Sequence, residues 1–276
     1  GLENLKIKIA DINVNNENRD FDESTLSRLE SLVSIEHLPK LNSEKLLIRE
    51  VNLSNLKGIE SINHLEELSI SNSRSLKAID SLSELKNLKK LKIGTCPEIQ
   101  DYSVLSELNS LETCLLGDRY SVSSSDESES KQEILPKRWP ENLKFMQLST
   151  SANGIGELPS NLQIIELTNC TKIKSLNELK ICSNLNKSGG GPFYSEEGKI
   201  DLSSCPSLIN LDGLENKPHI NKILISPFIT NLDAISAIDD LEITIKFEKI
   251  DGINEITKIS DELSMALSKL KNFKMI

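Results

Sequence analysis

The side chains best suited to nucleophilic or metal chemistry are few and scattered along this chain. Three histidines and five cysteines occur among 276 residues, and no two cysteines form a CxxC pair. An odd number of separate cysteines fits neither a zinc site nor a disulfide framework, so we expect reduced, buried thiols. These residues are His37, His64, His219, Cys96, Cys114, Cys170, Cys182 and Cys205.

Short catalytic signatures are also missing from the sequence. HExxH, GxSxG and GxxxxGK[ST] do not occur. The glycine run in SGGGPFY, residues 188–194, lacks the Lys-Ser/Thr pair that a phosphate-binding loop needs. Carboxylates are plentiful, but none stands in a recognisable pocket context. We therefore predict that this protein is not an enzyme and has no catalytic residues, no metal and no cofactor.

Composition narrows the classes of partner. The net charge is −10 and the pI is about 5.0, so we expect neither nucleic acid nor a membrane surface as a partner. Hydrophobic residues make up 37% of the chain and aromatic residues only 4%. A core built almost wholly from Leu and Ile favours many similar small layers over one large globular core.

Leucines and isoleucines return with a constant spacing. Leu65, Leu88 and Leu111 are 23 residues apart, as are Leu68 and Leu91. Each unit reads LxxLxI, then a polar stretch, then apolar residues at about every third position. The first part alternates as a strand does, and the second suits a 3₁₀ or irregular helical turn. One strand and one return segment in each repeat predict a solenoid coil.

This pattern resembles the leucine-rich repeat family, whose signature is LxxLxLxxN/CxL. The resemblance covers residues 41 to 247, and Cys96, Cys170 and Cys205 stand at its Asn/Cys position. It implies an α/β solenoid, with a curved parallel sheet on the concave side and 3₁₀, irregular or short helical segments on the convex side. At the Asn/Cys position, a small side chain turns inward and bonds the backbone of the next coil.

Two segments break the repeat, and the ends need caps. We expect an N-terminal cap at 1–40 (a strand plus an amphipathic helix over 22–35), coils at 41–117, and an acidic Ser-rich insertion at 118–138. Further coils follow at 139–249 with a Gly-rich insertion at 186–198, and a C-terminal cap helix lies within 250–276. Bare terminal coils would expose apolar faces, which is why caps are expected.

The residues between the inward leucines point outward onto the concave face. Leu115, Phe145 and Ile164 are apolar there in successive coils, and an apolar row beside two lysines indicates a contact patch. The candidate partner-binding residues are Lys90, Lys92, Leu115, Phe145, Gln147, Ile164 and Glu166. Phe193 and Tyr194 in the Gly-rich insertion are further candidate contacts.

The segments WPENL (139–143) and LPSNL (158–162) resemble the LPX repeats of secreted bacterial effectors. We predict a non-catalytic module that binds a partner protein, in a bacterial effector-like, immunity or scaffold role. Reduced thiols favour the bacterial cytosol, or the host cytosol if the protein is secreted. Two alternatives stay open: a recognition module of a larger protein whose enzymatic activity lies elsewhere, and ligand or glycan binding by SGGGPFY.

Overall fold

The computed structural model describes residues 12–14, 23–27, 34–36, 44–117, 132–187, 196–238, 240–247, 259–270 and 274–275. Twelve strands occur there: β1 (Ile12–Val14), β2 (Glu23–Ser27), β3 (Lys45–Arg49), β4 (Glu67–Ser71), β5 (Lys90–Gly94), β6 (Thr113–Leu116), β7 (Phe145–Leu148), β8 (Ile164–Leu167), β9 (Lys199–Leu202), β10 (Lys222–Ile225), β11 (Glu242–Ile245) and β12 (Lys274–Met275). The helical elements are η3 (Ile59–Ser61), η4 (Asp80–Glu84), η5 (Ser103–Glu107), η6 (Asn177–Ile181), η8 (Asp233–Ile235) and α1 (Asp261–Ser268).

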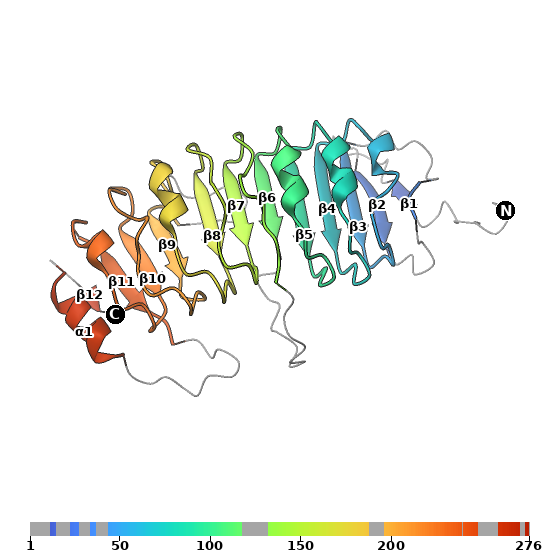
Figure 1. Cartoon of the computed structure of the whole chain (residues 1–276). Coiled ribbons are helices and arrows are strands. Elements are labelled where there is room, and N and C mark those ends of the chain that lie inside the picture. Colours follow the sequence, from blue (N-terminus) through green and yellow to red (C-terminus); the bar gives the residue numbers. More distant parts are fainter. Residues whose placement is uncertain are drawn as a thin grey trace.

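The strands stack side by side into one elongated array (Figure 1). β1 to β8 form one sheet in chain order, and β9 to β12 form a second. Apart from the antiparallel β1–β2 pair, every paired strand is parallel to its neighbour. Each coil supplies one strand and one return segment, so the fold is the leucine-rich repeat solenoid that the sequence predicts.

A continuous aliphatic spine fills the interior. The second and fourth residues of strands β3 to β11 point inward because side chains alternate along a strand. Leu46, Leu68, Leu91 and Cys114 are in register in β3 to β6, and each is at most 2% exposed. Burial of one such side chain contributes about 1.5–3 kcal/mol of hydrophobic free energy. The spine therefore supplies the main stabilisation of the array.

Each coil turns sharply where its strand ends. The residue after the strand has positive φ in successive coils, at Glu50 (55°), Asn72 (55°) and Thr95 (51°). The turns hydrogen-bond to one another, since the Asn72 N–H donates to the Gly94 carbonyl at 3.1 Å. The left-handed conformation ends the strand and directs the chain into the return segment.

The cysteines of the repeat signature lie just after this turn. Cys96 is 7% exposed, and Cys170 and Cys205 are fully buried, which confirms that they are structural thiols. The Cys170 thiol donates to the Leu148 carbonyl of the preceding coil at 3.4 Å, whereas Cys96 bonds the Gly94 carbonyl of its own coil. Cys170 thus makes the inter-coil bond that the family resemblance implies.

The ladder between β8 and β9 is interrupted. The Asn186 N–H donates to the Gln163 carbonyl of the preceding coil at 2.6 Å, and its side-chain amide donates to the Lys199 carbonyl. The Gly198 N–H in turn donates to the Asn186 carbonyl at 2.9 Å. Asn186 and Gly198 therefore bracket the point where the Gly-rich segment leaves and rejoins the array. The central residues of that segment, 188–195, lie outside the described residues.

The structure corrects two sequence-based expectations. Residues 23–27 form strand β2, paired with β3, and not the start of a helix. Helical periodicity is a local signal that takes no account of other strands. Pairing of residues 23–27 with β3 satisfies the backbone N–H and C=O groups at the edge of β3, which would stay unpaired if residues 23–27 formed a helix. Residues 132–138 belong to a coil: Ile134 exchanges backbone hydrogen bonds with Gln100 and Tyr102. The rest of the predicted acidic insertion, 118–131, lies outside the described residues.

At the C-terminal end, α1 packs against the spine through Leu263 and Leu267, which are 0% and 4% exposed. The Ser260 hydroxyl caps this helix by accepting from the Leu263 N–H at 3.1 Å. Strand β12 pairs with β11 beyond it.

Candidate functional site

The outward residues of strands β3 to β11 form a single surface, which we call the strand face. Its first row contains the first residue of each strand: Lys45, Glu67, Lys90, Thr113, Phe145, Ile164, Lys199, Lys222 and Glu242. Its second row contains the third residue: Leu47, Ser69, Lys92, Leu115, Gln147, Glu166, Asp201, Leu224 and Thr244. In-register pairing within each sheet sets neighbouring members of a row about 4.8 Å apart.

A shared carboxylate organises the N-terminal part of the first row. Glu67 accepts from Lys45 at 3.1 Å on one side and from Lys90 at 2.8 Å on the other. Burial alone would raise the pKa of Glu67, but the hydrogen bonds from the two lysines outweigh it and lower the pKa. One carboxylate thus serves two cations.

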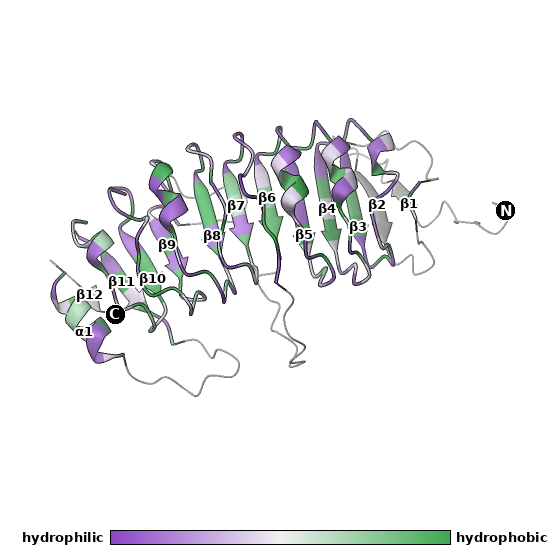
Figure 2. Cartoon of the chain, in the orientation of Figure 1, coloured by the Kyte–Doolittle hydropathy of each residue, from purple (hydrophilic) through white to green (hydrophobic). Residues whose placement is uncertain are grey.

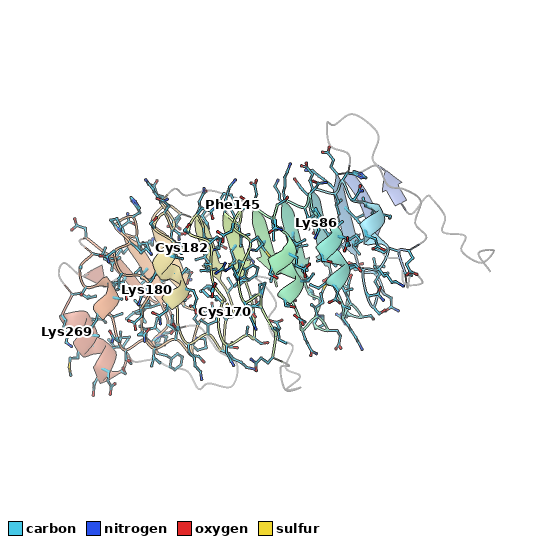
Figure 3. The ribbon with its side chains drawn as sticks, turned by 45° about the horizontal axis from the view of Figure 1, so that its top comes forward. Lys86, Phe145, Cys170, Lys180, Cys182 and Lys269 are labelled. Carbon is cyan, nitrogen blue, oxygen red and sulfur yellow. The ribbon has the colours of Figure 1, made fainter. Side chains whose placement is uncertain are left out.

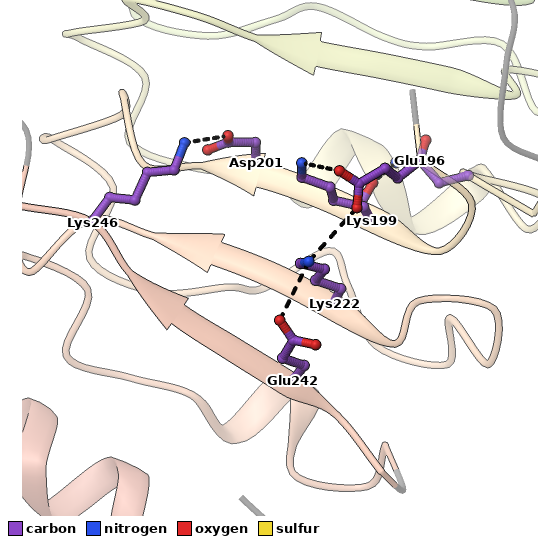
Figure 4. A network of polar contacts seen from close by, with 7 residues as sticks. Glu196, Lys199, Asp201, Lys222, Glu242 and Lys246 are labelled. Carbon is purple, nitrogen blue, oxygen red and sulfur yellow. Dashed lines mark hydrogen bonds and ion pairs between the residues drawn. The ribbon is translucent and has the colours of Figure 1, made fainter. Parts of the chain in front are cut away.

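The C-terminal part of the strand face carries a second network (Figure 4). Glu196 contacts Lys199 at 2.9 Å and Lys222 at 3.7 Å, and Lys222 also contacts Glu242 at 3.4 Å. The hydrogen bond from Lys199 lowers the pKa of Glu196, and the bond to Glu242 raises the pKa of Lys222. These contacts join β9, β10 and β11 across their outward surface.

A second contact in this region ties β9 to the residue after β11. Lys246 pairs with Asp201 at 2.9 Å. Burial opposes ionisation of Asp201, yet hydrogen bonds from Ser203 and Lys246 outweigh it and lower the pKa of the carboxyl. The charged groups of β9 to β11 are therefore largely committed to one another.

Between the two networks lies an uncharged stretch, which we call the neutral centre: Thr113, Leu115, Phe145, Gln147 and Ile164. Phe145 pairs in register with Thr113 on one side and Ile164 on the other. Figure 2 shows the apolar colouring of β8 beside the more polar β9. Figure 3 places Phe145 midway along the array.

The predicted contact residues divide into those that solvent can reach and those that are buried. Phe145 and Leu115 are half-buried, and Lys90 and Lys92 are exposed. Ile164 is only 2% exposed and Gln147 only 5%, so the expectation that these two present a solvated surface is wrong. Glu166 is half-buried beside them. The alternation rule gave the correct direction for each side chain, but two of the outward side chains are buried in the folded chain.

The structure brings seven of the predicted residues together on β5 to β8. Phe193 and Tyr194 lie outside the described residues. Sequence reasoning missed the ion networks that flank the neutral centre. One signal was available, because Lys45, Glu67 and Lys90 alternate in charge at nearly the repeat spacing.

Three of the buried thiols, those of Cys114, Cys182 and Cys205, are not poised for chemistry. Burial raises the pKa of Cys114 far above its usual range and that of Cys182 to about 11. A hydrogen bond with Cys170, together with burial, raises the pKa of Cys205. Since the thiolate is the nucleophile, these groups stay inert at neutral pH. No group of three or more His, Cys, Asp and Glu side chains in the described part of the chain could hold a metal ion.

One buried cation stands out on the return side of the coils. Lys217 is 3% exposed, and its amine donates to the Lys180 carbonyl of the preceding coil at 3.1 Å. Burial lowers its pKa, because the charged amine is desolvated. Lys217 precedes Ile220 by three residues, as Cys182 precedes Leu185 and Leu108 precedes Leu111, so it fills an apolar position of the repeat.

None of the described helices is long and apolar enough to cross a membrane.

Neither a protein-family model nor a curated protein matches this sequence. Among solved structures, the chain is similar to an internalin from Listeria monocytogenes, with 14% identity, 92% of this chain and 75% of that chain covered, and a TM-score of 0.48. It is also similar to an LRR protein from Leptospira interrogans, with 15% identity, 88% and 71% covered, and a TM-score of 0.34. The coils of this chain, with in-register strands and a shared aliphatic interior, are those of a leucine-rich repeat solenoid.

Proposed function

We propose that this chain is a non-catalytic recognition module that binds a partner protein on its strand face. The neutral centre carries this proposal, because Phe145 and Leu115 present apolar surface between two charged networks. An apolar centre with a polar rim is the arrangement of protein interfaces. The buried Ile164 and Gln147 support the floor of this surface, and Phe145 and Leu115 make the contact.

The rigidity of the surface supports the same role. The strands from β3 to β8 pair with one another in register, and the ion pairs of Glu67 tie side chains across β3 to β5. A preformed surface loses little conformational entropy on binding, which favours affinity.

The biological setting that we propose is a bacterial effector-like, immunity or scaffold role. The segments WPENL and LPSNL support it, since the pair resembles the LPX style of repeat, with Trp139 in the place of its first leucine. In the structure, Trp139 and Leu158 of these segments are 1% and 6% exposed. These segments therefore build the coils beneath the neutral centre and leave recognition to the strand face.

The test compares two variants, in each of which serine replaces one apolar side chain. Phe145→Ser removes apolar area from the neutral centre, and Ile181→Ser does the same on η6, where Ile181 is 56% exposed. Partners captured by the wild-type chain are identified by quantitative mass spectrometry, purified, and titrated against all three proteins. Circular dichroism checks that each variant folds.

We expect Phe145→Ser to weaken binding about tenfold or more and Ile181→Ser to change it less than about twofold. The reverse ranking would place the interface on the return side of the coils and refute the proposal.

A further inference from the structure

The strand face has the opposite charge balance to the whole chain. The outward strand positions hold six cations and four carboxylates: Lys45, Arg49, Lys90, Lys92, Lys199 and Lys222 against Glu67, Glu166, Asp201 and Glu242. The chain as a whole has a net charge of −10. We propose that the strand face selects an acidic protein segment that carries an apolar residue. This inference rests on the proposed function and names the class of partner.

The ion network on the N-terminal side of the neutral centre leaves positive charge in excess. Glu67 is shared by Lys45 and Lys90, whereas Lys199 and Lys222 are balanced by Glu196 and Glu242. Among the rim residues just before the strands, Lys89 pairs with Glu66 and Lys144 with Glu112, and Glu44 adds one more carboxylate before β3. A carboxylate shared between two lysines neutralises only one of them. A partner that brings further carboxylates therefore gains Coulomb energy over the first row.

Lys92 is the cation best placed to meet such a partner. It is exposed, and no described residue forms an ion pair with it. It lies in register with Leu115, and Phe145 stands on the strand after Leu115. A carboxylate bound at Lys92 would thus hold a neighbouring apolar side chain over Leu115 and Phe145. The spacing suits acidic and apolar residues that follow one another closely in an extended segment.

Nucleic acid carries negative charge too, but it fits this surface less well. Glu166 and Asp201 lie in the same row as Lys92, on the far side of the neutral centre. A backbone with a phosphate at every nucleotide would meet these carboxylates, whereas a protein segment can place its acids over the lysines alone.

Fluorescence anisotropy with three labelled probes tests the inference. The probes are a peptide of about 20 residues with the repeat Glu-Glu-Leu, its Lys-Lys-Leu counterpart, and a single-stranded oligothymidylate of similar length. The proteins are the wild type, Lys92→Glu, Lys77→Glu and Phe145→Ser. Lys77 is an exposed lysine of the return segment and serves as the matched control for charge reversal.

We expect the acidic peptide to bind and the basic peptide and oligothymidylate not to bind. Lys92→Glu should weaken binding about tenfold, and Lys77→Glu by less than about twofold. Raising the salt from about 50 mM to about 300 mM should weaken the wild-type complex, since screening acts on exposed charges. Equal binding of both peptides, equal loss in the two charge variants, or Lys92-dependent binding of oligothymidylate would overturn the inference.

The purified partner separates this inference from the proposed function. The affinity of the partner could fall in Phe145→Ser and stay unchanged both in Lys92→Glu and at higher salt. That result would support recognition on the strand face and refute the preference for an acidic segment. A partner that ignores Phe145→Ser as well would remove both.

Discussion

Gly213 is the position where two coils approach each other most closely among the described glycines. Its φ is +109°, and a Cβ atom built there would lie 1.9 Å from the Leu176 carbonyl oxygen of the preceding coil. The Gly213 N–H also donates to the Glu215 carboxylate at 2.7 Å. We predict that Gly213→Ala strongly destabilises the array, because both the backbone conformation and the coil spacing exclude a methyl group.

The expected magnitude has two parts. A non-glycine residue at such a φ costs about 2 kcal/mol. Reaching an ordinary contact of 3.4 Å would also require the Leu176 oxygen to move by about 1.5 Å, and this atom is backbone. Overpacking of this kind costs about 2 kcal/mol more. The free energy of unfolding should therefore fall by about 4 kcal/mol, a large share of the roughly 5–15 kcal/mol typical of a folded protein.

Urea denaturation followed by two probes measures this change. Far-UV circular dichroism reports on all coils, whereas fluorescence of Trp139, the single tryptophan, reports on the coil before β7. Solenoid stability is nearly a sum over neighbouring repeats. Gly213→Ala should therefore lower the transition seen by circular dichroism more than the one seen by fluorescence.

Gly154→Ala is the matched control. A Cβ atom at Gly154 meets nothing within 4 Å, and its φ lies outside the left-handed range. Alanine there should be neutral or stabilise the protein by about 0.5 kcal/mol, because it restricts the unfolded chain. If the two variants differed by less than about 1 kcal/mol, the coils would be able to separate locally, and reasoning from close approach would be refuted.

Two further predictions concern the polar groups inside the array. Lys217→Met should stabilise the protein by about 1–2 kcal/mol at neutral pH, because a buried cation is replaced by an apolar side chain. Burial lowers the folded-state pKa of Lys217, so the stability advantage of the variant should shrink as pH rises from that folded pKa through about 10.5, the range in which the folded wild type loses its buried charge. Urea titrations at neutral and alkaline pH measure the difference in free energy of unfolding between variant and wild type, and the same difference at both pH values would contradict the prediction. Trp139→Phe removes the donor to the buried Ile155 carbonyl, a bond of 2.6 Å, and should cost about 2 kcal/mol by circular dichroism; an unchanged midpoint would show that this carbonyl has another donor.

The spacing of apolar residues in the sequence predicted the buried interior correctly, but it did not predict the structure of the N-terminal end. The spacing of Leu65, Leu88 and Leu111 identified buried positions, and all three are 0% exposed. The N-terminal segment was misjudged because apolar residues at helical spacing do not reveal that the edge of β3 is open. Strand β2 forms there since pairing with β3 satisfies backbone groups that are distant in sequence.

The strand face shows the same division. Alternation along the strands determined that Phe145, Ile164 and Lys92 point outward, because the side-chain period of a strand is a local property. Whether an outward residue reaches solvent depends on what packs over it in the folded chain, so only the tertiary structure decided that Ile164 is buried while Phe145 is partly open. The shared carboxylates of Glu67 and Glu196 likewise exist only once the coils stack. The sequence by itself thus determined the repeat, its register and its inward spine, and the packing of coil on coil decided which outward side chains a partner can touch.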